Sequence, residues 1–122
     1  MAMEHEALTE RIIGAAYNVH NALGFGFAEK VYENAMAVEL RKDGVPFEQQ
    51  RPIRVTYRDE VVGDYLADLV VDDEVIVEVK AVSALEPAHE VQLVNYLKAT
   101  GIRVGLLIDF GRRVEVKRRV FG

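Results

Sequence analysis

The sequence predicts a mixed α/β fold, a single domain in which two helices precede three strands, a third helix and two further strands. Apolar residues recur at helical spacing as far as Leu40, whereas from Phe47 onward they alternate or run together, as in strands. A further helical stretch after Pro87 separates the third strand from the fourth, so at least one helix crosses over to a later strand. The 122 residues contain no linker, repeat or low-complexity tract, and we therefore expect residues 1–122 to form one domain.

Two helices are expected in the first 44 residues. In the first, Thr9 is a candidate cap and Gly24 follows the last turn. Its apolar positions at helical spacing are Leu8, Ile12, Ala15, Val19 and Ala22. The second helix begins after the break at residues 24–26 and ends at Gly44. Its apolar positions are Val31, Tyr32, Ala35, Met36, Val38 and Leu40.

Strand patterns fill most of the remaining chain. The segment QRPIRVTYR alternates, residues 58–60 can turn, and residues 61–71 form a second strand that reaches a turn signal at residues 72–74. VIVEVKAV follows as a third strand. Pro87 suits the first turn of a helix that ends at Gly101 and whose apolar stripe is Val91, Val94 and Leu97. RVGLLIDF is apolar enough to be a buried central strand, and VEVKRRVF alternates as the last strand.

Composition limits the classes of protein to which the chain can belong. Half of the residues are apolar and 29% are charged, which favours a folded domain with one core over a disordered chain. No apolar run reaches the roughly 20 residues that a membrane-spanning helix needs, and the first residues lack the pattern of a signal peptide. The absence of cysteine excludes disulfides, cysteine-ligated zinc and a cysteine nucleophile. We therefore expect a soluble, cytoplasmic protein with no membrane partner.

Charge is distributed unevenly along the chain. Residues 1–110 carry 19 acidic and 10 basic side chains, a net charge of −9, whereas residues 111–122 carry one acidic and five basic side chains, a net charge of +4. The acidic body argues against tight non-specific binding of nucleic acid, because such binding depends on neutralising phosphates with lysine and arginine. The basic last strand is better explained as a sheet edge with solvated charges, which deter aggregation.

The hairpin between the second and third strands decides whether the acidic residues meet. Glu78 and Lys80 are two residues apart in one strand and therefore share a face. With a three-residue loop at 72–74, Asp68 lies opposite Glu78, and Leu66 lies opposite Lys80. A two-residue loop would send Asp68 to the other face. Because both faces of this hairpin are apolar, the alternation leaves both registers open.

In the three-residue register, two carboxylates face each other beside a lysine. This arrangement is costly unless a positive charge occupies the gap. Mg²⁺ or Mn²⁺ would suit oxygen ligands from Asp68, Glu78 and the backbone carbonyl of Val79, and Lys80 would orient a water molecule or stabilise developing charge. The alternative is an ordinary salt bridge between Lys80 and one carboxylate, which such a short pattern also fits.

Several motifs in one order resemble the GxxExxY protein family. They are Gly26, Glu29 and Tyr32 in GFAEKVY, ADL around Asp68, EVK from Glu78 to Lys80, and HEVQLVNYLKATG at residues 89–101. The likeness extends from about residue 8 to residue 117. This family belongs to the PD-(D/E)xK nuclease-like superfamily, so the resemblance implies a restriction-endonuclease-like core and a metal-dependent hydrolase that acts on nucleic acid.

The resemblance also implies roles for particular residues. Asp68 and Glu78 correspond to the two acidic metal ligands, and Lys80 corresponds to the motif lysine. Glu29 corresponds to an additional acidic residue on the leading helix. The implied cofactor is Mg²⁺ or Mn²⁺. Leu66 departs from related sequences, which often carry arginine there, so a phosphate contact is missing.

Two further helices carry candidate substrate-binding residues. Gln92 and Tyr96 match a QxxxY element found in related nucleases, and their i, i+4 spacing places them on one helix face together with His89. A core position with a bonded hydroxyl is the alternative for Tyr96. His20 recurs in the family pattern, and a hydrogen-bonded structural role is its preferred interpretation.

Two functions remain open at this point. The first is a nuclease in which Asp68, Glu78 and the Val79 carbonyl bind the metal ion and Lys80 assists phosphodiester hydrolysis, with Glu29 and Gln92 lining the site. The second is a non-catalytic module that keeps the fold and associates with nucleic acid or protein. A homodimer that brings two sites together is also expected to be compatible with so small a domain, with the basic last strand as an interface or a nucleic-acid contact.

Overall fold

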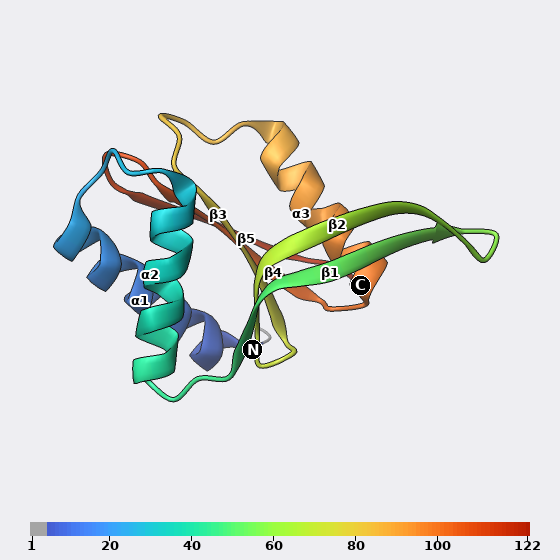
Figure 1. Cartoon of the computed structure of the whole chain (residues 1–122), viewed down its shortest axis with the longest axis horizontal. Coiled ribbons are helices and arrows are strands. Elements are labelled where there is room, and N and C mark those ends of the chain that lie inside the picture. The colour runs from blue at the N-terminus through green and yellow to red at the C-terminus, as the bar shows by residue number, and fades with distance from the viewer. Residues whose placement is uncertain (1–4) are drawn as a thin grey trace.

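A five-stranded sheet lies between two helical layers in the computed structural model, which describes residues 5–122 (Figure 1). The elements are α1 (Glu6–Leu23), α2 (Glu29–Lys42), β1 (Phe47–Tyr57), β2 (Glu60–Val71), β3 (Val75–Lys80), α3 (Pro87–Thr100), β4 (Val104–Phe110) and β5 (Val114–Val120). One core cluster joins α1 and α2 to one face of the sheet, and a second joins α3 to the other face. The predicted mixed α/β class and element order are confirmed.

The strand order is the same in space as in sequence, from β1 to β5. All neighbouring strands are antiparallel except β3 and β4, which run parallel because α3 crosses over between them. Every residue of β4 is buried, and β5 lies at the edge. Both predictions for these strands are therefore confirmed, and the charged side chains of β5 flank the sheet where no further strand of residues 5–122 pairs with it.

The helices form where predicted, but some of their expected details are wrong. Thr9 lies inside α1, buried, and its hydroxyl donates to the carbonyl oxygen of Glu6, so it is not the cap. Other expected core positions face solvent, namely Ala22, Val31, Val38 and Val91. In α2 the buried stripe is Tyr32, Met36 and Leu40, because each of these is four residues from the next. No helix within the described residues is long and apolar enough to cross a bilayer.

The β1–β2 hairpin leaves the sheet halfway along its length. Pairing between β2 and β3 extends only from Val71 with Val75 to Leu69 with Val77, whereas pairing between β1 and β2 continues to the turn after Tyr57. Beyond this point residues 51–67 form a two-stranded arm that projects past the sheet beside α3 (Figure 1). Asp68 therefore lies at a fork, where β2 separates from β3.

The two faces of the hairpin are exchanged at the same point. Gln50 has a positive φ of 57°, and Gln50 and Asp68 drop out of the ladder between β1 and β2. Leu69 packs on the side of α1 and α2, whereas Ala67 packs with α3, and so does Val70. In a regular strand Ala67 and Leu69 would share a face. The distortion turns the apolar side of the arm toward α3.

Candidate active site

The loop between β2 and β3 has three residues, 72–74, which is the length required by the register that places Asp68 opposite Glu78. Asp72 and Asp73 both adopt positive φ angles, and the Glu74 N–H donates to the carbonyl oxygen of Val71 over 2.9 Å. The pairing of Leu69 with Val77 then brings the next residues, Asp68 and Glu78, across from each other. The two-residue register is wrong.

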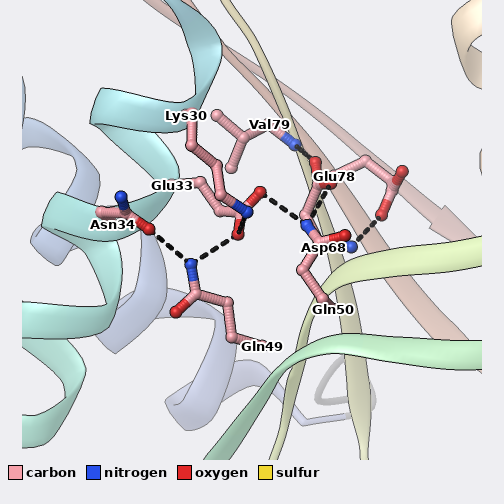
Figure 2. A network of polar contacts seen from close by, with 8 residues as sticks. All are labelled: Lys30, Glu33, Asn34, Gln49, Gln50, Asp68, Glu78 and Val79. Carbon is pink, nitrogen blue, oxygen red and sulfur yellow. Dashed lines mark hydrogen bonds and ion pairs between the residues drawn. The ribbon is translucent and has the colours of Figure 1, made fainter.

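Each of the two carboxylates caps the backbone of the opposite strand (Figure 2). The Asp68 N–H donates to Oε2 of Glu78 over 2.9 Å, and the Val79 N–H donates to Oδ2 of Asp68 over 2.8 Å. These side-chain bonds replace ladder bonds that the strands lose where they separate. The fork therefore fixes both acids in position without help from a flexible loop.

Electrostatics make this pair unfavourable when both acids are charged. Glu78 is only 5% exposed, and burial, followed by the charge of Asp68, raises its pKa to about 8. Burial, followed among the charges by Glu33, also raises the pKa of Asp68, although the hydrogen bond from the Val79 N–H opposes the shift. Two desolvated carboxylates of this kind attract a cation or a proton.

A third carboxylate, Glu33 of α2, approaches the fork from the other layer. It is buried, and the side chain of Gln50 joins it to Asp68, donating from Nε2 to Oε1 of Glu33 over 2.8 Å and to Oδ1 of Asp68 over 3.4 Å. Gln49 and Lys30 also donate to Glu33 (Figure 2). The sequence carried a signal for Glu33 that the prediction missed, because an acidic residue three positions before Met36 lies on the buried stripe of α2.

The structure does not bring Glu29 to the acidic pair. Glu29 is the first residue of α2 and is exposed, and it is Glu33, one turn further along, whose charge acts on Asp68 and Glu78. The resemblance placed an acid on the correct helix, and the helix presents a different acid to the fork.

Lys80 stands near both carboxylates without pairing to either. Its charge lowers the pKa of Asp68 and of Glu78, against the larger effect of burial. Among residues 5–122 no ion pair joins Lys80 to either carboxylate, so the simple salt bridge is not found. Leu66 does not lie opposite Lys80, because β2 has already left β3, and its side chain is exposed.

Tyr96 and Gln92 lie on α3, on the other side of the fork from Glu33. Tyr96 is buried, and burial, then the charges of Glu78 and Asp68, raise its pKa to about 12, so the phenol stays a neutral donor. Gln92 is exposed and lines, with Tyr96, a cleft between α3 and the arm. His20 is elsewhere: its Nε2 lies 2.8 Å from the carbonyl oxygen of Gly111 and ties α1 to the β4–β5 turn, the structural role that was preferred.

The donor atoms at the fork fit a hard divalent cation. Glu78 accepts a backbone N–H through Oε2 and keeps Oε1 for another partner. Asp68 accepts a backbone N–H through Oδ2, and its Oδ1, which accepts from Gln50 over 3.4 Å, has a further lone pair that a cation could share. The described residues contain no group of three or more acidic or histidine side chains that would hold a metal ion alone, so backbone carbonyl and water would have to complete the shell. Mg²⁺ commonly keeps several water ligands in this way.

Comparisons with other proteins agree with this architecture. A crystal structure of a protein named SSO0001 superposes with a TM-score of 0.60 at 14% sequence identity, over 95% of this chain and 59% of that one. This likeness concerns the fold, and the chain spans less than two thirds of that protein. Comparison with curated proteins finds no match. A family model described as the PD-(D/E)XK nuclease superfamily matches residues 6–120. The chain therefore belongs to the PD-(D/E)XK nuclease superfamily.

Proposed function

We propose that this protein is a metal-dependent nuclease that hydrolyses phosphodiester bonds at the fork. The observation that carries the proposal is the pair of carboxylates, half-buried Asp68 and buried Glu78, each accepting a backbone N–H of the opposite strand. Oε1 of Glu78 stays available, and Oδ1 of Asp68 is engaged by a long hydrogen bond of 3.4 Å from Gln50. Lys80 lies two residues after Glu78 on the same strand. Such an arrangement has little structural purpose of its own, because burying two adjacent acids destabilises the fold.

Mg²⁺ or Mn²⁺ would be held by Asp68, Glu78 and the carbonyl of Val79, and would supply charge neutralisation and a more acidic bound water. Lys80, which pairs with neither acid, is free to orient the attacking water or to stabilise charge on the phosphate. Tyr96 keeps its proton and can donate a hydrogen bond toward the same place. Glu33 and Gln50 position Asp68 from the side of α2.

Metal binding is the first test, because it needs no choice of substrate. Mn²⁺ is titrated calorimetrically into the wild-type protein and into Asp68→Asn and Glu78→Gln, which keep the acceptor atoms for the backbone N–H groups. Asp109→Asn is a matched control, since Asp109 is a buried carboxyl that also accepts a backbone N–H, that of Val82, on a different strand. We expect binding in the wild type and the control, and its loss in both fork variants. Binding that survives both changes contradicts the proposed metal site.

Cleavage then separates the nuclease from its competitor. We expect Lys80→Met to retain Mn²⁺ binding while its cleavage of labelled DNA or RNA falls by about 10² or more, the usual contribution of a group that assists proton transfer. Metal binding without metal-dependent cleavage of any nucleic-acid probe would favour the alternative, a module that keeps the fold without turnover. The acidic body and the absence of arginine at Leu66 are the observations on its side.

A further inference from the structure

A cleft of about 880 Å³ separates α3 from the arm. Its lining consists of Arg54, Val55, Thr56, Tyr65, Ala88, Val91, Gln92, Asn95, Tyr96, Lys98 and Ala99. These residues include two cations and no carboxylate, although the chain as a whole has 20 acidic and 15 basic side chains. The cleft therefore differs in charge from the acidic body around it and suits an anionic or neutral polar ligand.

An aromatic ring is presented on the arm side of this cleft. Tyr65 is 47% exposed, and its ring centroid lies 5.6 Å from that of Tyr96, with the rings tilted by 46°. Gly63 lies behind the ring, where an added Cβ would come within 3.0 Å of the Tyr65 Cε2 atom. Tyr65 thus keeps accessible surface that another flat group could contact, and the absence of a side chain at Gly63 allows the ring to lie where it does.

The cleft and the fork share one wall. Tyr96 lines the cleft and is close enough to Asp68 and Glu78 for their charges to act on its phenol. The exchange of faces at Gln50 and Asp68 produces this proximity, because it turns the arm toward α3 at the residue where the acidic pair begins. Asp68 and Glu78 do not line the cleft themselves, so Tyr96 is the residue through which a ligand in the cleft adjoins the fork.

We propose that the cleft binds an unpaired stretch of nucleic acid, with one base stacked on Tyr65 and the adjacent phosphates near Arg54 and Lys98. This inference deepens the nuclease proposal and rests on it for the statement that the bound strand is the substrate. Gln92 and Asn95 offer amide donors and acceptors to the base edges or the backbone. Aromatic stacking combined with cations is the general means by which proteins hold single strands.

A single strand fits these observations better than a duplex. Stacking on Tyr65 requires a base whose face is free, and the bases of a duplex are already stacked on each other. Duplex binding depends on neutralising many phosphates, and the cleft supplies two cations, one of which, Arg54, lies 3.6 Å from Asp64. The volume also lies in the range of pockets that enclose a small group rather than a helix.

Fluorescence anisotropy at low salt tests the proposal without requiring cleavage. The probes are a short labelled oligothymidylate, the matching oligouridylate, and a blunt duplex of the same length, all in metal-free buffer. We expect the wild type to bind a single-stranded probe more tightly than the duplex, and Tyr65→Leu to weaken that binding by roughly ten-fold, as for loss of one stacked base. Tyr65→Phe should bind as the wild type does, because it keeps the ring.

Tyr57→Leu is the matched control, since Tyr57 is a more exposed tyrosine (63%) at the end of the same arm but outside the cleft. Its affinity should equal that of the wild type. The proposal is overturned if the wild type binds no single strand or prefers the duplex, if Tyr65→Leu retains full affinity, or if Tyr57→Leu loses as much. Loss of single-strand binding in Tyr65→Leu together with failure of the Mn²⁺ titration would support the cleft as a binding site for single strands and would contradict the proposed nuclease activity.

Discussion

The two ends of β2 have opposite environments. Residues 69–71 are buried and pair with β1 on one side and β3 on the other, whereas residues 60–66 have β1 alone as a neighbour and are largely exposed. Asp68 stands at the boundary. The difference shows that one strand has two structural roles. Its last residues are part of the core, and its first residues separate from β3 and face α3. The candidate site forms at the point of release, where backbone groups lose their ladder partners and side chains replace them.

Two leucines three residues apart give the strongest contrast. Leu69 is fully buried against α1 and α2, whereas Leu66 is 51% exposed on the arm. We expect Leu69→Ala to lower the free energy of unfolding by about 3 kcal/mol, since it opens a cavity in the core. Leu66→Ala should cost less than about 1 kcal/mol, as at other exposed positions. Urea denaturation of both variants measures the difference, and equal losses would show that the arm is as firmly packed as the core.

The acidic pair makes the stability of the metal-free protein depend on pH. Above the ordinary Glu78 pKa of 4.5 the unfolded chain loses this proton, whereas the folded chain keeps it until about pH 8. Folding therefore binds a proton in this window, and the free energy of unfolding falls as pH rises, by at most about 1.4 kcal/mol per pH unit for one group. Asp68, whose pKa is also raised, adds to the fall in the same direction.

Denaturation across this pH window, in a chelating buffer, measures the slope. Glu78→Gln should be more stable than the wild type at the upper end of the window and should lose most of the slope. Mn²⁺ added to the wild type at the upper end should restore stability, because it binds the folded state. A wild-type free energy of unfolding that rises with pH across the window would contradict the raised pKa assigned to Glu78 in the folded protein.

Much of the fold followed from local patterns. Hydrophobic periodicity and turn residues gave the order of elements, the buried β4 and the edge strand β5. Periodicity failed where a helix carries apolar residues on more than one face, so Val38 and Val91 were expected inside and lie outside. These errors have one cause: the sequence of a helix fixes its period, and only packing fixes which face is buried.

The site was predictable in part. The motif named Asp68, Glu78 and Lys80, and the structure places the two acids together. It did not name Glu33: the spacing from Met36 indicates that Glu33 is buried, but which acid of α2 reaches the fork depends on how α2 is rotated against the sheet. It also gave no sign of the cleft, which depends on the distortion at Gln50. A positive φ at a glutamine has no local sequence signature comparable to that of glycine or asparagine.

Gly63 provides a smaller test, confined to the arm. In Gly63→Ala the new Cβ would meet the Tyr65 ring at 3.0 Å, and the ring is the end of a side chain that can move. We expect the free energy of unfolding to change by less than about 1 kcal/mol, whereas binding of the oligothymidylate weakens by a few-fold because the stacking surface is displaced. Unchanged affinity would mean that the exact placement of the ring does not matter for binding.

The smallest effect is expected at the ion pair between Arg54 and Asp64. The guanidinium Nε lies 3.6 Å from the carboxylate on the neighbouring strand, and both side chains are largely exposed, so Asp64→Asn should change stability by less than about 0.5 kcal/mol. The same change removes a negative charge beside a cation of the cleft. Single-strand binding should therefore tighten by about two- to five-fold at low salt, and the gain should fade as salt screens the charges. Weaker binding, or a gain that persists at high salt, would show that Arg54 does not face the phosphates of the bound strand.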